Sequence, residues 1–280
     1  MPEFAVIPTQ NSKRKAKNMK KNILLGVAFA TLAASCSQKA KTDAQVGVYT
    51  MDQAVMTNGA TETAYKASEG HTQIKIYTPG AYFFIAQSKD SSAGFGVGTY
   101  TQEGNKIVET NIFNTNTLDT AQQVGLDITK SEKGYSQMIP EMMIGGNKIS
   151  IKEDYTAIAA SGSSALDGVW HQTKNLVING KDSADQTYNE YKVYQSGHFM
   201  WGAKYLTDTA SKTYKNIVGH GTFTLNNDAL TESLEMANVS GITGKYNIIV
   251  KFNGADEYTQ QTADTSTHVV GLKTYKRVSK

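Results

Sequence analysis

The chain has 280 residues, with 28 lysine or arginine and 25 aspartate or glutamate side chains, so its formal net charge is +3. The positive balance comes from residues 1–35, which hold six basic side chains and one acidic; the rest holds 22 basic and 24 acidic. The charge is therefore no sign of nucleic-acid binding, and no nucleic-acid partner is expected. A single cysteine excludes an intrachain disulfide framework.

A lysine-led apolar segment begins at Met19 and ends in small residues before the only cysteine, Cys36. Its apolar part has about 12 residues, too few for a helix of about 20 to span a bilayer, and the layout is typical of a secretory signal. It resembles a bacterial lipoprotein signal. The resemblance implies that residues 1–35, a signal with an N-terminal extension starting at Met1 or Met19, are removed. Cys36 would then carry the lipid, and residues 36–45 would form a tether.

The residues after Cys36 include no aspartate directly behind the cysteine and no acidic run. By the same resemblance, this favours an outer-membrane protein, held in the membrane by its lipid and facing the periplasm; the surface-exposed side stays open. Two other interpretations of the cysteine are a buried core thiol and a catalytic nucleophile, and the signal in front of it disfavours both.

From residue 46 onward the sequence repeats itself in order, at an offset of about 120 residues. We therefore expect two β domains, 46–158 and 166–280, joined by a small polar linker at 159–165 and folding separately. The matching segments are Gly47-Val48-Tyr49 with Gly168-Val169-Trp170, Gln73–Tyr77 with Glu190–Tyr194, Tyr82 and Phe84 with Phe199 and Trp201, Gly96–Thr101 with Gly219–Thr224, and Glu109 with Glu232.

Short alternating apolar runs separated by turn residues predict strands in each repeat, and no segment shows a ten-residue helical stripe. Eight strands in about 110 residues predict a small antiparallel eight-stranded barrel, with a two-sheet sandwich as the alternative. In the second repeat the expected strands are 167–175, 188–195, 198–205, 214–224, 229–236, 244–252, 256–262 and 269–278.

Gly168-Val169-Trp170, at the start of a predicted strand, resembles the Gly-x-Trp signature of lipocalins. The resemblance implies tandem lipocalin-like barrels, each with an apolar pocket, in which the Trp closes one end against a basic residue of the last strand. Arg277 or Lys276 would be that partner in the second barrel. The first repeat departs from the signature: it has Tyr49, with Lys152 as the candidate partner.

No catalytic or metal-binding pattern stands out. The histidines show no metal-ligand spacing, and there is no Gly-x-Ser-x-Gly elbow. Asp182–Glu190 lacks the glycine that a calcium loop needs at its sixth position, so we interpret it as a solvated loop. We expect no cofactor, no metal and no enzymatic activity.

Strand alternation places Glu232 on one face with Leu230 and Leu234, and Glu109 occupies the same place in the first repeat. Because a carboxylate on an apolar face needs a partner, both should be buried and hydrogen-bonded. Each either pairs with an internal side chain or anchors a ligand. Further candidates as ligand contacts or barrel core are Trp201, Tyr194, His220 and Phe84.

These features favour a lipid-anchored envelope protein that binds or shuttles a small, partly apolar molecule in a barrel pocket. The alternative is a non-catalytic interaction module, with filled barrels that present loops to an envelope protein partner. A large apolar cavity would favour the first function, and two packed interiors the second.

Overall fold

The computed structural model describes residues 45–88, 92–115, 122–144, 146–186, 188–208, 213–264 and 269–278. In these ranges the regular structure is β-strand apart from one 3₁₀ turn, η1 (Ala67–Glu69), and no helix there is long and apolar enough to cross a membrane. The expected signal and Cys36 lie outside the described residues.

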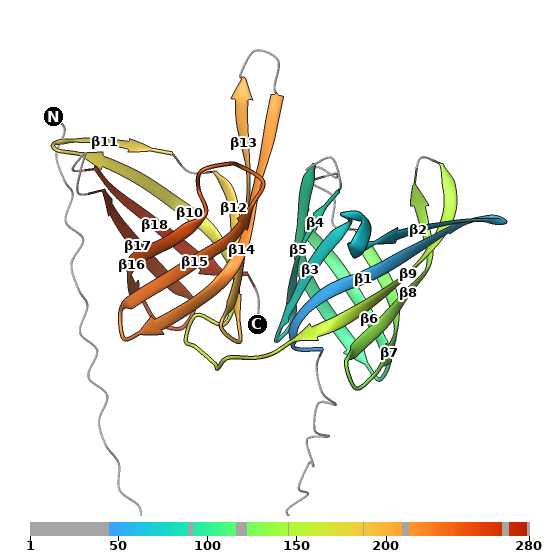
Figure 1. Cartoon of the computed structure of the whole chain (residues 1–280). Helices are drawn as coiled ribbons and strands as arrows, with labels where there is room; N and C mark the ends of the chain where they lie inside the picture. The colour runs from blue at the N-terminus through green and yellow to red at the C-terminus, as the bar shows by residue number, and fades with distance from the viewer. Residues whose placement is uncertain are drawn as a thin grey trace, which may run out of the picture. The chain divides into compact units, whose positions relative to one another are not determined.

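The strands form two antiparallel sheets that follow one another along the chain (Figure 1). The first contains β1 (Gly47–Asn58), β2 (Thr61–Lys66), β3 (Thr72–Thr78), β4 (Ala81–Gln87), β5 (Ala93–Glu103), β6 (Lys106–Asn114), β7 (Gln123–Lys130), β8 (Gly134–Ile144) and β9 (Asn147–Ile158). The second contains β10 (Gly168–Asn179), β11 (Asp182–Asp185), β12 (Asn189–Gln195), β13 (His198–Asp208), β14 (Thr213–Asn226), β15 (Ala229–Ala237), β16 (Gly244–Phe252), β17 (Glu257–Asp264) and β18 (Val269–Arg277).

Each sheet closes on itself, because β1 pairs with β9 and β10 pairs with β18. Both are therefore closed eight-stranded barrels, and the sandwich alternative is excluded. The ninth strand of each sheet extends the wall: β10 pairs with β12 through residues 168–171 and with β11 through residues 176–179. Closure leaves each barrel an inner face, which can be packed or hollow.

The predicted strand positions agree with the observed ones to within a few residues, with one exception. β11 lies in the segment that was expected to be a solvated loop. All four of its side chains are exposed, so no apolar alternation marks it as a strand. Its backbone nevertheless pairs with the end of β10.

Inward-facing aromatic and aliphatic side chains form a core in each barrel. Both cores are rich in tyrosine, which supplies apolar area together with a hydroxyl that must find a partner. The first core holds Tyr77, Tyr82, Tyr100, Tyr135 and Tyr155, and the second holds Trp170, Tyr194, Tyr258 and Tyr275.

A third apolar cluster has members from both barrels, on the faces that point away from the barrel interiors. Phe113 of the first barrel stacks on Tyr191 of the second with 5.6 Å between ring centroids. A Cβ on Gly202 would lie 2.6 Å from the Phe95 ring, so the glycine permits this close packing. The other buried members include Ile76, Phe83, Ile85, Val97, Val193, Met200 and Val218.

Candidate functional site

Trp170 closes one end of the second barrel, where the lipocalin-like signature predicts it. Its Nε1 donates a hydrogen bond to the Leu166 carbonyl at 2.7 Å, and the Arg277 guanidinium lies 4.1 Å from the ring centroid. Such a cation–π contact contributes about 0.5–2 kcal/mol. Gly168 is required here, because a Cβ at that position would lie 1.9 Å from Arg277 Nη1.

Inside each barrel a lysine, a glutamate and a tyrosine form the same buried cluster. In the second barrel Lys192 Nζ lies 2.8 Å from Glu232 Oε1, and the Tyr194 hydroxyl donates to the same oxygen. In the first barrel Lys75 Nζ lies 2.7 Å from Glu109 Oε1, and Tyr77 donates to that glutamate. The expectation that Glu109 and Glu232 are buried and paired is confirmed: they are 6% and 5% exposed.

The second barrel carries an additional ion pair. Glu190 accepts from Lys273 Nζ at 2.8 Å and from the Tyr275 hydroxyl. Burial alone would raise the pKa of Glu190, but the positive charges of Lys273 and Lys192 outweigh burial and hold it below its usual value. The charges of the two lysines and two glutamates therefore balance in two ion pairs, Lys192–Glu232 and Lys273–Glu190.

The first barrel does not repeat this second pair at the equivalent positions. At the positions equivalent to Glu190 and Lys273 it carries Gln73 and Glu153. Glu153 accepts from the Tyr155 hydroxyl at 2.8 Å and from Gln137. Burial raises the pKa of Glu153, and the charge of Lys75 only partly offsets this effect. The first interior therefore contains one carboxylate more than its lysine can balance.

A cavity of about 300 Å³ opens into the second barrel above these ion pairs. Its volume lies at the lower limit for small-molecule sites. Apolar side chains and the two ion pairs line it together. The lining residues are Glu190, Lys192, Phe199, Trp201, Glu232, Leu234, Ile242, Tyr246, Ile248, Gln260, Thr262 and Lys273.

Two differences between the repeats make this cavity apolar. In the first barrel the Tyr82 hydroxyl donates to Asn111 Oδ1, so this part of the interior is polar and internally satisfied. The equivalent residues in the second barrel are Phe199 and Leu234, which have no polar atoms in their side chains and line the cavity. An apolar surface without a protein partner favours an apolar ligand.

Of the six ligand-contact candidates expected from the sequence, two line this cavity, Glu232 and Trp201. Tyr194 does not line the cavity mouth; it is fully buried beneath Glu232, and burial followed by the glutamate charge raises its pKa well above normal. Glu109 and Phe84 belong to the first barrel, where Phe84 packs against the tyrosine core.

His220 is not a residue of the cavity. It pairs across the sheet with Met200, which belongs to the cluster outside the barrel, and burial lowers its pKa. The alternation of β14 places His220 on one face with Val218, as expected, and that face belongs to the outer cluster rather than to the cavity.

Lys152 is not the partner of Tyr49. It lies opposite Val55, while Tyr49 lies opposite Ala157, and its side chain is half exposed beside Asp154. Tyr49 instead packs edge-on against Tyr135, with 4.8 Å between ring centroids. The first barrel therefore lacks the Trp–Arg closure of the second.

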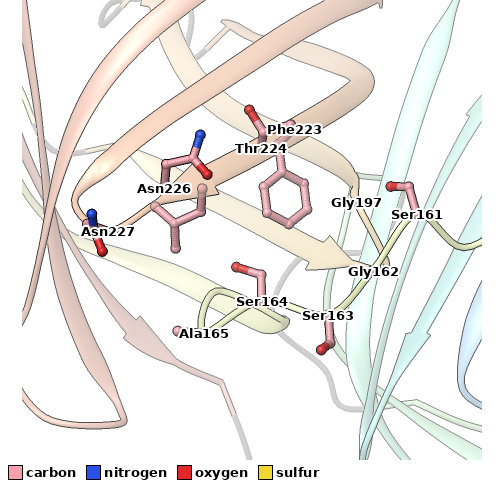
Figure 2. Close-up of a pocket in the computed structure, with 11 residues that line it drawn as sticks. Ser161, Gly162, Ser163, Ser164, Ala165, Gly197, Phe223, Thr224, Asn226 and Asn227 are labelled. Carbon is pink, nitrogen blue, oxygen red and sulfur yellow. The ribbon is translucent and has the colours of Figure 1, made fainter.

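A larger hollow of about 500 Å³ lies between the linker and the β14–β15 turn. Figure 2 shows the linker serines on one side and Phe223, Asn226 and Asn227 on the other. No charged or titratable side chain lines it, so we see no chemistry that would select a ligand there. The barrel cavity is therefore the better candidate site.

Sequence reasoning missed Lys192, Lys273 and Glu190, which complete the ion pairs. Lys75 and Lys192 occupy equivalent positions between apolar neighbours of predicted strands, and that repeated placement is the signal that could have identified them. Ile242, in the segment before β16, and Tyr246, near the start of β16, carry no comparable signal. Within the described residues, no group of three or more His, Cys, Asp or Glu could hold a metal ion.

No family model matches the sequence, and no curated protein matches it. A solved structure from Bacteroides fragilis NCTC 9343, named provisionally as an outer membrane protein, matches 83% of this chain and 97% of its own. The identity is 11% and the TM-score 0.24. At that score the likeness supports no conclusion about this protein.

Proposed function

We propose that this protein is a lipid-anchored envelope protein that binds a small, partly apolar molecule in its second barrel, without catalysing a reaction. The apolar cavity carries the proposal: Phe199 and Leu234 line it where the first barrel has a hydrogen-bonded Tyr–Asn pair. The signal ending at Cys36 supports the anchor and the outer-membrane location, with the periplasm as the expected side.

The first barrel favours a second, complementary role. Its interior is occupied by tyrosines that contact one another, such as Tyr135 stacked on Tyr155 at 4.8 Å. A filled barrel is suited to holding shape rather than to holding a ligand. We therefore assign it to the alternative function, a non-catalytic interaction module that presents its loops to an envelope protein partner.

Native mass spectrometry of the lipidated protein from its own host tests the binding function. We expect a co-purified small molecule, lost in Leu234→Trp, because the larger side chain fills the cavity. Ile249→Trp is the matched control, since Ile249 lies on the neighbouring strand but is 56% exposed. Thermal unfolding of both variants checks that they fold. A bound molecule that survives Leu234→Trp, or no bound molecule at all, would contradict binding at this cavity.

A further inference from the structure

We propose that the cavity of the second barrel selects an uncharged ligand, one with an apolar body and a neutral hydrogen-bond acceptor, and discriminates against ions of either sign. This inference rests on the proposed function and specifies its ligand class. It follows from three properties of the cavity: its balanced charges, its surplus of donors, and its apolar wall.

The charges at the cavity are already balanced. Lys192 pairs with Glu232 and Lys273 pairs with Glu190, each at 2.8 Å. Three of these four side chains are less than 10% exposed, so their charges act in a medium where water screens weakly. An ionic ligand would lose its hydration without meeting an uncompensated opposite charge. A neutral ligand avoids that cost.

Each carboxylate oxygen at the cavity already accepts a hydrogen bond, whereas some donors remain unused. Glu190 uses both oxygens, one for Lys273 and one for Tyr275, and Lys192 reaches both oxygens of Glu232. Lys273 Nζ donates to Glu190 with one of its three protons, and its side chain is 30% exposed. Gln260 accepts from Lys192 through Oε1 at 3.4 Å, which leaves its NH₂ group to donate. A ligand acceptor such as a carbonyl or ether oxygen matches this surplus.

The remaining wall sets the shape of the ligand. Phe199, Trp201, Leu234, Ile242 and Ile248 surround the space with apolar and aromatic surface. A volume of about 300 Å³ equals roughly ten water molecules at about 30 Å³ each. One or two fused rings fit that space, whereas a long acyl chain would extend beyond it.

Three probes with one bicyclic body and different charges test the inference: neutral 2-acetylnaphthalene, anionic 2-naphthoate and cationic 2-naphthylmethylammonium. Calorimetric titration of the mature protein at pH 7 should show the ketone binding at least about tenfold more tightly than either ion, given the cost of an unpaired charge in a buried site. Equal or tighter binding of either ion would overturn the inference while leaving the binding function standing. Binding of none of the three would overturn both.

Charge-changing variants sharpen the test. Glu190→Gln leaves the charge of Lys273 uncompensated, so the affinity for naphthoate relative to the ketone should rise about tenfold. Lys273→Gln leaves Glu190 uncompensated and should shift the preference toward the ammonium probe. The two variants deform the site in different ways, so opposite shifts would not arise from misfolding. Glu153→Gln, in the first barrel, is the matched control and should leave the preference unchanged. An unchanged preference in both cavity variants would refute the role of charge balance.

Discussion

At the scale of single residues, the two barrels differ most in how they accommodate a second buried carboxylate. Glu190 has a lysine directly against it, and its pKa is lowered because Lys273 and Lys192 outweigh burial. Glu153 has hydroxyl and amide donors but no lysine of its own, and burial raises its pKa. The second buried carboxylate, which the two barrels carry at different repeat positions, therefore stabilises the second barrel when ionised and destabilises the first.

We predict opposite effects of Glu190→Gln and Glu153→Gln on stability at neutral pH. A lowered folded-state pKa contributes stability above the unfolded value of about 4.3, and this is lost as the pH falls through the folded pKa. Glu190→Gln should therefore lower the free energy of unfolding by roughly 2 kcal/mol at pH 7, mainly because it leaves Lys273 unpaired. The loss should be smaller in acid. Glu153→Gln should raise the unfolding temperature at pH 7, because it removes an ionised group that burial disfavours.

The advantage of Glu153→Gln should disappear as the pH falls through the raised pKa of Glu153, where the wild-type carboxyl takes up its proton. Thermal unfolding followed by circular dichroism between pH 4 and 8 measures both effects. Shifts of the same sign in the two variants at pH 7 would contradict this account of the two carboxylates.

Burial of Glu109 and Glu232 could be predicted from strand alternation, but their partners could not. Alternation fixes which face a residue occupies along one strand. The contact between Lys192 on β12 and Glu232 on β15 depends on how the barrel closes, which no local pattern encodes. An extra residue on β15 between Leu234 and Met236 likewise changes a face: Met236 packs against the outer cluster, whereas unbroken alternation would place it beside Leu234 on the inner face.

At the scale of elements, the start of β10 depends on one glycine. Gly168 has φ of 143°, and Arg277 Nη1 occupies the space where a Cβ would lie. Because Gly168 has no side chain, the Arg277 guanidinium can approach the start of β10, where its Nη1 donates a hydrogen bond to the Asp167 carbonyl at 2.7 Å. This explains in physical terms why a glycine precedes the closing tryptophan by two positions.

Gly168→Ala should lower the free energy of unfolding by about 2–3 kcal/mol, because it displaces Arg277 from Trp170 and strains the backbone. Gly180→Ala is the matched control. It also has a positive φ, of 60°, but nothing lies within 4 Å of its Cβ position, so only about 1 kcal/mol of backbone strain is expected. Urea denaturation measures both. If both variants lose the same free energy of unfolding, the close approach of Arg277 contributes nothing to stability.

Strand positions were largely predictable because turn residues mark them: Asn179-Gly180 and Asn253-Gly254 have positive φ at their glycines, as expected for such turns. β11 was not predictable, since its side chains are all exposed and its strand character comes only from pairing with β10. Closure into a barrel was inferred from strand number and repeat length. The identity of the closing pair in the first barrel was misjudged because Lys152 lies too far along β9 from Tyr49.

At the scale of the whole molecule, the sequence predicts two separately folding domains joined by a small polar linker. The apolar cluster with members from both barrels adds a direct contact between these two domains. Outward-facing residues such as Phe83 and Val193 are 0% exposed because they belong to a core shared by both barrels. Alternation predicts that these faces are apolar but cannot tell an outer face covered by another barrel from an inner one. The hydrophobic contact therefore holds the barrels together independently of the linker.

We predict that the two barrels stay associated after the linker is cut. A specific protease site inserted after Gly162, where nothing surrounds the Cβ position, allows one clean cleavage. Gel filtration of the cut protein should give one peak at the size of the intact chain. Phe83→Arg should split it into two half-size peaks, because it buries a charge in the shared cluster. Val108→Arg is the control: it lies on the same barrel but is 39% exposed, so the halves should stay together. If the unsubstituted halves separate at micromolar concentration, the linker alone keeps the barrels together.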